Sequence, residues 1–265
     1  MRKHSQWLLV CASCALASLA STGAFAQALD DTIGREAAQP PTVSSLIAAW
    51  MAFPELDQVV WPYSYIRVAE DDERARQVRS DLGQELSTLA ARLDAYGGRQ
   101  PLRSTVKAWQ KRLGTLSATR VPGDWSPASL MTRPYQRPPV SAITALGACR
   151  APDWVEVWDA NGIHRTDWRG GLTLSDLLTD RSLRSGSAGR VAIVDPYGQI
   201  IHRGVQAWNF ADAPLAPGSR VIASLPLNGE AFPWIRDAIA RVLAHAPPAD
   251  DCREVQILAT GGSHE

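Results

Sequence analysis

The chain has 265 residues, which is room for one large domain or two small ones. It carries 27 basic and 27 acidic side chains, so its charge does not attract nucleic acid and we expect no nucleic-acid partner. No apolar run beyond the N-terminal segment approaches the ~20 residues that span a bilayer, so we expect no membrane span in the mature chain.

The first 26 residues have the features of a cleaved signal peptide. Positive residues at 2–4 precede an apolar stretch over 7–19, and the small-x-small sequence at 24–26 suits signal peptidase. We therefore expect cleavage after Ala26 and a periplasmic mature protein. A lipid attached at Cys14 is the alternative, but this cysteine falls too early for a full apolar core.

Removal of the signal peptide leaves 25 basic and 27 acidic residues, a net charge of −2. It also removes Cys11 and Cys14, so that Cys149 and Cys252 remain. In an oxidising compartment an isolated pair is most simply a disulfide, which we predict here. It would close a loop of ~100 residues, worth ~3–5 kcal/mol in the chain-entropy model. The alternatives, two free thiols or a metal site, lack the other ligands, and we expect no metal.

A helical hairpin is predicted in the first half of the mature chain. Residues 27–41 are polar and fit either a first strand with a linker or an irregular segment. Two leucine-rich stripes at helical spacing then flank Tyr96-Gly97-Gly98, which predicts two antiparallel helices over about residues 69–117. We place this hairpin as an insert in a first domain that spans 27–139. The Pro- and Arg-rich stretch 119–139 would supply the closing strand of that domain and the linker to the next.

The second half of the chain has the pattern of a small β-rich module. Asn161-Gly162 supplies the positive φ angles of a hairpin turn, and Thr173 or Ser175 can cap a short helix of leucines. The sequence at 195–198, Asp-Pro-Tyr-Gly, then turns between a second pair of strands. Hairpin, helix and strands in this order are typical of a β-grasp (ubiquitin-like) domain, which we place at 140–228.

One short sequence motif occurs twice. Residues 42–47 resemble residues 173–178, and each is followed by a strand with a Pro-Tyr turn, at Pro62-Tyr63 and at Pro196-Tyr197. Two copies of one module would explain this, although short apolar runs also recur by chance. We predict an α+β fold with two β-grasp domains.

The C-terminal segment, residues 229–265, returns to a helical pattern. Apolar residues share one face, namely Phe232, Ile235, Ile239, Val242 and Leu243. This amphipathic helix either packs on its own domain or docks on a partner. We favour packing, because a disulfide at Cys252 would hold the helix end against the domain.

Motifs of covalent chemistry are absent from the mature sequence. It contains no Gly-rich phosphate loop, no Gly-x-Ser-x-Gly, no Cys-x-x-Cys and no metal-type histidine spacing. Carboxylates such as Asp71-Asp72, Asp212 and Asp250-Asp251 lie at turns or helix starts, where they act as caps or face solvent. We therefore expect no catalytic residues, no cofactor and no enzyme activity.

Tryptophan is frequent, with nine residues in the mature sequence. Because a small β-grasp core needs bulky side chains, we expect seven of them in the core: Trp61, Trp109, Trp154, Trp158, Trp168, Trp208 and Trp234. Trp125 lies in a turn-rich stretch and could instead be exposed and stack on a sugar ring, so it is a candidate binding residue.

Together these features resemble the GfcC family of capsule and exopolysaccharide biosynthesis proteins, which are periplasmic relatives of the soluble-ligand-binding β-grasp (SLBB) domains of polysaccharide exporters. The resemblance covers about residues 40–245 and departs from the family in the Pro-rich link, the cysteine pair and the tail after Pro247. It is carried by Ser45-Leu46, Phe53-Pro54, Val60-Trp61-Pro62, the helical insert that ends at Ala118-Thr119-Arg120, residues 191–198, Val205-Gln206-Ala207-Trp208-Asn209, residues 215–219 and Leu227-Asn228.

The resemblance implies two β-grasp domains, a helical hairpin inserted in the first and an amphipathic C-terminal helix. It also implies a binding site at a buried arginine between the domains, which by position is Arg120. A purely structural ion pair is the alternative for a buried guanidinium.

The function that the resemblance implies is a non-enzymatic, periplasmic accessory role in capsule or exopolysaccharide assembly or export. The expected partners are a polysaccharide or a protein of the envelope export machinery. Two alternatives come from other classes. One is a carbohydrate-active enzyme with an unrecognised carboxylate pair, and the other is an outer-membrane exporter subunit that inserts its last helix.

Overall fold

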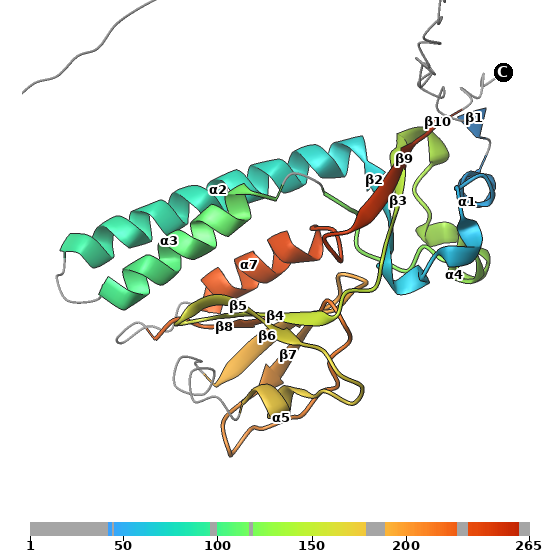
Figure 1. The fold of residues 1–265 in the computed structure, drawn as a ribbon. Helices are drawn as coiled ribbons and strands as arrows, with labels where there is room; N and C mark the ends of the chain where they lie inside the picture. Colours follow the sequence, from blue (N-terminus) through green and yellow to red (C-terminus); the bar gives the residue numbers. More distant parts are fainter. Residues whose placement is uncertain are drawn as a thin grey trace, which may run out of the picture. The chain divides into compact units, whose positions relative to one another are not determined.

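The computed structural model describes residues 42–43, 45–95, 100–116, 119–178, 189–226 and 233–259. The expected signal peptide, its cleavage after Ala26 and the segment 27–41 lie outside the described residues. The protein has an α+β fold (Figure 1). Its elements in chain order are β1 (Thr42–Val43), α1 (Leu46–Met51), η1 (Leu56–Gln58), η2 (Trp61–Tyr63), β2 (Ser64–Val68), α2 (Ala69–Ala95), α3 (Gln100–Gly114), α4 (Pro127–Thr132), η3 (Pro134–Gln136), η4 (Val140–Ala142), β3 (Ile143–Cys149), β4 (Trp154–Asp159), β5 (Gly162–Asp167), α5 (Leu174–Leu177), β6 (Arg190–Val194), β7 (Ile200–Gly204), β8 (Arg220–Ala223), α7 (Pro233–Ala244), β9 (Cys252–Gln256) and β10 (Leu258–Ala259).

A five-stranded sheet with the order β5-β4-β8-β6-β7 forms the larger layer. The turn at Asn161-Gly162 closes the β4–β5 hairpin as predicted, and Gly162 has a φ of 124°. β8 lies between the two hairpins, parallel to β4 and antiparallel to β6. Helix α5 covers one face of this sheet, and its N-terminus is capped by Thr173 and Asp176.

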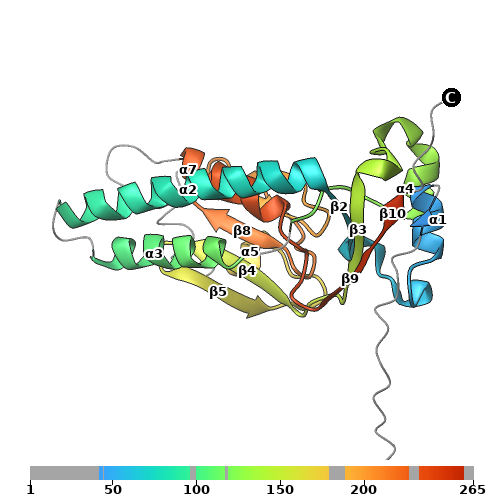
Figure 2. The same ribbon diagram turned by 90° about the horizontal axis from the view of Figure 1, so that it is seen from above.

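The opposite face of this sheet carries α3 and α7. Helix α3 contacts β5, α7 contacts β6 and β8, and α2 lies over both helices (Figures 1 and 2). The rings of Trp109 on α3 and Trp158 on β4 lie 5.9 Å apart in the core. The predicted helical hairpin is confirmed, and it follows β2 as expected. It packs, however, on the five-stranded sheet, because that sheet offers the large apolar face that two leucine stripes need.

A second, antiparallel sheet has the order β2-β3-β9, and β1 pairs in parallel with β10. Its strand β3, residues 143–149, falls in the range expected for the second domain, and β9 comes from the C-terminal tail. The expected division at residues 139/140 therefore does not separate the two sheets. The closing strand expected in 119–139 is reduced to one bridge between Val121 and Ile66, because Ser126 caps the short helix α4 instead.

The predicted disulfide between Cys149 and Cys252 is confirmed. The two residues are directly opposite each other on β3 and β9 and are separated by 103 positions in the sequence. The bond therefore fixes the C-terminal tail to the central strand of the smaller sheet.

Helix α7 packs against its own protein, as we favoured. Ile235, Ile239 and Leu243 are buried between the sheet and the hairpin. No helix in the described part of the chain combines the length and the apolar character needed to cross a membrane.

Candidate functional site

A pocket of about 290 Å³ lies where the two Pro-Tyr pairs of the sequence meet. Pro62 and Tyr63 belong to η2, just before β2, whereas Pro196 and Tyr197 belong to the turn between β6 and β7. The rest of the wall comes from Ile193, Asp195, Ile201, Ala213, Pro214, Ala216 and Ser219. The two Pro-Tyr pairs of the repeated motif thus line two sides of one pocket between the two sheets.

The first side of the pocket is held by local hydrogen bonds of η2. The backbone N–H of Tyr63 donates to the carbonyl oxygen of Val60 at 2.8 Å, and the hydroxyl of Ser64 donates to that of Trp61 at 2.8 Å. The Tyr63 hydroxyl donates to the Pro217 carbonyl oxygen at 3.0 Å. Tyr63 therefore joins η2 to the loop that precedes β8.

The second side depends on Gly198. Its φ is 80°, and a Cβ atom there would lie 2.7 Å from the carbonyl oxygen of Ala244 at the end of α7. Asp195 accepts a hydrogen bond from the N–H of Gln199 at 2.8 Å, and the Tyr197 carbonyl accepts one from Gly123 at 2.8 Å. Only glycine suits both the turn and the close approach to the helix.

The electrostatics of the pocket favour uncharged phenols. Burial, and then the neighbouring Tyr197, raise the pKa of Tyr63 to about 12. Burial also raises the pKa of Tyr197, and it raises the pKa of Asp195 despite hydrogen bonds from Gln199 and the charge of Arg120. Among the described residues that line the pocket, Asp195 alone carries a charged group. The pocket therefore offers aromatic and proline faces with one carboxylate as a hydrogen-bond acceptor.

Arg120 lies behind the turn and not in the pocket wall. It is 1% exposed, its Nε donates to the Ala244 carbonyl at 3.1 Å, and its Nη1 donates to the Pro196 carbonyl. Burial, and then the charge of Arg220, lower the pKa of Arg120 to about 9. Within the described ranges no carboxylate forms a salt bridge with it, so the alternative ion pair is not formed, and its buried Nη2 atom has no hydrogen-bond partner among the described residues. Its guanidinium instead fixes the pocket turn to the end of α7.

Arg220 holds the same helix end from β8. Its Nη1 and Nη2 atoms donate to the carbonyl oxygens of Leu243 and Pro247 at 3.3 and 2.7 Å. The last carbonyls of a helix lack intrahelical partners and carry its negative dipole end, which favours cationic side chains there. Arg120 and Arg220 thus clamp the C-terminus of α7 from two directions.

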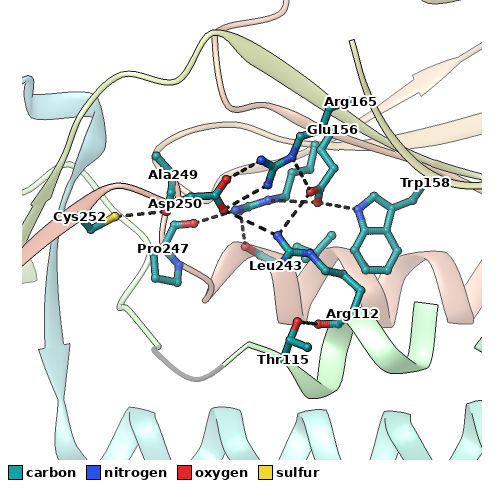
Figure 3. Close-up of polar contacts among 11 residues, drawn as sticks. Arg112, Thr115, Glu156, Trp158, Arg165, Leu243, Pro247, Ala249, Asp250 and Cys252 are labelled. Carbon is teal, nitrogen blue, oxygen red and sulfur yellow. Dashed lines mark hydrogen bonds and ion pairs between the residues drawn. The ribbon is translucent and has the colours of Figure 1, made fainter. Parts of the chain in front are cut away.

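An ion network extends from this clamp to the surface (Figure 3). Glu156, 2% exposed, lies on β4 opposite Arg165 on β5 and Arg220 on β8. The indole of Trp158 donates to Glu156 at 2.9 Å, and the Arg165 guanidinium donates to both carboxylate oxygens of Asp250. The hydrogen bonds from Arg165 hold the pKa of Asp250 below its usual range. The network ties the chain after α7 to the sheet, which is a structural role.

Sequence reasoning did not identify this network. The signal was present, because Glu156 stands between the apolar residues Val155 and Val157 of a buried strand, and the Asn161-Gly162 turn places Arg165 opposite it. A carboxylate on a buried strand needs a cationic or hydrogen-bonding neighbour.

The predictions for three tryptophans have to be corrected. Trp125 is 7% exposed, and its indole donates to the Val121 carbonyl at 3.0 Å, so it is not available to stack on a sugar. It is buried because α4 and its flanking turn cover the smaller sheet. Trp208 and Trp234, which we expected in the core, are 84% and 43% exposed.

A wider hollow of about 610 Å³ lies between the α1–β2 connection and the start of β9. Its charged walls are paired with each other, Glu55 with Arg253 at 3.0 Å and Arg150 with Asp251 at 3.7 Å. We place the candidate site at the smaller pocket, whose lining includes two tyrosines and three prolines, namely Tyr63, Tyr197, Pro62, Pro196 and Pro214.

The described residues contain no group of three or more His, Cys, Asp or Glu side chains that could hold a metal ion. Comparison with protein-family models gave no match, and comparison with curated proteins gave no match either.

Proposed function

We propose that the protein is a non-enzymatic, periplasmic accessory protein of capsule or exopolysaccharide assembly or export, and that it belongs to the GfcC family. We further propose that it binds a polysaccharide in the pocket between the two Pro-Tyr turns. The observation that carries this proposal is the pocket itself, in which tyrosine and proline faces from distant parts of the chain converge.

The topology of the larger sheet supports the family assignment. A β-grasp domain consists of a hairpin, a helix, a second hairpin and a last strand that is inserted parallel to the first strand, and β4 to β8 with α5 follow this order. The smaller sheet with α1 supports a second such domain, into which the hairpin α2–α3 is inserted between β2 and β3. The disulfide fits an oxidising compartment such as the periplasm.

The chemistry of the pocket favours an uncharged sugar. Asp195 would repel a uronic acid or a phosphate but would accept hydrogen bonds from sugar hydroxyls. Arg120, which the resemblance implied as a binding residue, donates from Nε and Nη1 to carbonyl oxygens behind the pocket. Sugar rings would pack on Tyr197 and on the prolines, as ligands do in mostly apolar sites with few polar groups.

The test is affinity gel electrophoresis of the mature protein in gels that contain exopolysaccharide purified from the bacterium that makes it. We expect the polysaccharide to retard the protein, and Tyr197→Ala to weaken the retardation. The control is Tyr135→Ala, because Tyr135 is an exposed tyrosine outside the pocket. Equal retardation of Tyr197→Ala and Tyr135→Ala would reject the pocket as the binding site. New reducing ends in the same incubation would favour the enzyme alternative.

A further inference from the structure

Trp208 is the most exposed tryptophan in the described part of the chain, with 84% of its surface accessible. It lies in the loop of residues 205–210 that follows β7. Leaving a large indole in water forgoes the stabilisation that its burial would give. The exposure of this side chain therefore needs a cause in the fold.

The loop is built to keep this shape. The amide of Asn209 donates from Nδ2 to the Gly189 carbonyl at 2.9 Å, and its Oδ1 accepts from the Gln206 N–H at 3.0 Å. The N–H of Asn209 donates to the Gln206 carbonyl at 3.0 Å, and that of Val205 to the Gly189 carbonyl at 3.1 Å. A Cβ atom at Gly204 would overlap the carbonyl group of Asn209. Backbone and side-chain hydrogen bonds, together with a required glycine, thus hold Trp208 outward.

The size of the exposed surface indicates what binds there. A stable protein interface buries ~800 Å² on each partner, whereas one indole offers ~150–250 Å². Phe210, 43% exposed, is the other exposed large apolar side chain in this loop. The neighbours of the indole in the chain are Ala207 and Asn209. An area of this size matches the face of one sugar ring.

We infer that Trp208 is an aromatic platform on which one pyranose ring of a polysaccharide stacks, with its C–H groups on the indole face. This inference rests on the proposed polysaccharide binding but adds a contact outside the pocket. Gly204, next to the loop, and Ile200, next to the pocket turn, are the two ends of β7. They lie four residue steps of ~3.3 Å apart, so a single sugar ring does not reach both features but a polysaccharide chain does.

The experiment compares Trp208→Ala, Trp208→Phe and Tyr197→Ala with the unmodified protein, in gels that contain the purified exopolysaccharide. We expect Trp208→Ala to raise the apparent dissociation constant about tenfold, and Trp208→Phe, which keeps an aromatic face, to retain most of the affinity. Because the side chain is exposed, all Trp208 variants should melt at the temperature of the unmodified protein. Polysaccharide should also protect the unmodified protein, but not Trp208→Phe, from part of the acrylamide quenching of its tryptophan fluorescence.

The outcomes separate this inference from the pocket. Weakening by Trp208→Ala with no effect of Tyr197→Ala would support the platform and reject the pocket. Weakening by Tyr197→Ala alone would reject the platform. If neither the unmodified protein nor any variant is retarded, the platform is rejected. If Trp208→Ala instead abolishes co-purification of an envelope protein, the loop is a protein contact and the platform is again rejected.

Discussion

Gly198→Ala tests the contact between the pocket turn and the end of α7. The residue has a φ of 80°, in the left-handed region, and its added Cβ would lie 2.7 Å from the Ala244 carbonyl oxygen and 2.9 Å from Pro122. The left-handed conformation costs alanine ~1–2 kcal/mol. Overlap with fixed backbone atoms adds ~1–3 kcal/mol, because the helix end has to move. We therefore expect the free energy of unfolding to fall by ~2–5 kcal/mol.

A matched control is available in Gly171→Ala. Gly171 has nearly the same φ, 81°, but apart from its two neighbours in the chain no described residue places a heavy atom within 4 Å of the position of its Cβ. The substitution there measures the conformational cost alone, which we expect to be ~1–2 kcal/mol. The difference between the two variants therefore isolates the steric contact.

The assay is urea denaturation of both variants, followed by far-UV circular dichroism and analysed as the free energy of unfolding in water. Gly198→Ala should lose more stability than Gly171→Ala and should also bind polysaccharide less tightly, because Tyr197 moves with the turn. Equal losses in the two variants would refute the close packing of the turn against α7.

Three further predictions concern the core and the clamp. Arg120→Lys should lower the free energy of unfolding by ~1.5–3 kcal/mol, because one ammonium cannot replace a guanidinium that donates to both Ala244 and Pro196. Thermal melting measures this loss of stability, and an unchanged stability with lost polysaccharide binding would indicate that Arg120 contacts the ligand. Ile239 is 0% exposed, so Ile239→Asp should lower the free energy of unfolding by several kcal/mol, because it buries an unpaired carboxylate, whereas Arg241→Asp on the exposed face of α7 should be nearly neutral. An unchanged melting temperature in Ile239→Asp would mean that α7 docks elsewhere. Because burial raises the pKa of Tyr63 from 10 to about 12, the unfolded chain releases the phenol proton at a lower pH than the folded protein does. The free energy of unfolding should therefore fall as pH rises between 10 and 12. Tyr63→Phe should reduce that fall, and an unaltered pH profile in this variant would contradict the burial of the phenol.

Local patterns in the sequence predicted the elements that depend on local physics. The leucine period predicted α2 and α3, and Asn161-Gly162 predicted the β4–β5 hairpin, because side-chain spacing and positive φ are encoded within a few residues. The cysteine count predicted the disulfide for a similar reason, since cleavage of the expected signal peptide would leave only one possible pairing.

Pairings between distant segments were not predictable in this way. β3 and β9 are joined across about a hundred residues, and apart from the cysteine pair nothing in either short strand specifies its partner, so residues 143–149 were placed in the range of the second domain although β3 belongs to the smaller sheet. The burial of Trp125 and the exposure of Trp208 were interchanged for the same reason. A tryptophan in a turn-rich stretch is buried when a neighbouring element such as α4 covers it, and composition does not report that cover.

The position of Arg120 illustrates what the structure adds to a resemblance. The resemblance implied a buried arginine between two domains, but the acceptors of the Arg120 guanidinium are carbonyl oxygens that come within its reach only once α7 and the β6–β7 turn are in place. The same two acceptors explain its effect on the pocket, because one belongs to the turn that carries Tyr197. If the pocket binds the proposed polysaccharide, Arg120 would influence that binding by positioning the pocket wall.

The pocket joins segments that no local interaction would hold together. η2 and the β6–β7 turn are more than a hundred residues apart in the sequence, and their contact depends on Tyr63 at Pro217, Gly123 at Tyr197 and Arg120 at α7. In each of these links the acceptor is a backbone carbonyl oxygen, so the geometry of the pocket depends on the fold and little on the side chains of the accepting residues. A polysaccharide that filled the pocket would touch both segments and would bind only the assembled junction. Its binding energy would then add to the stability of the same contacts that Gly198, Arg120 and the end of α7 provide.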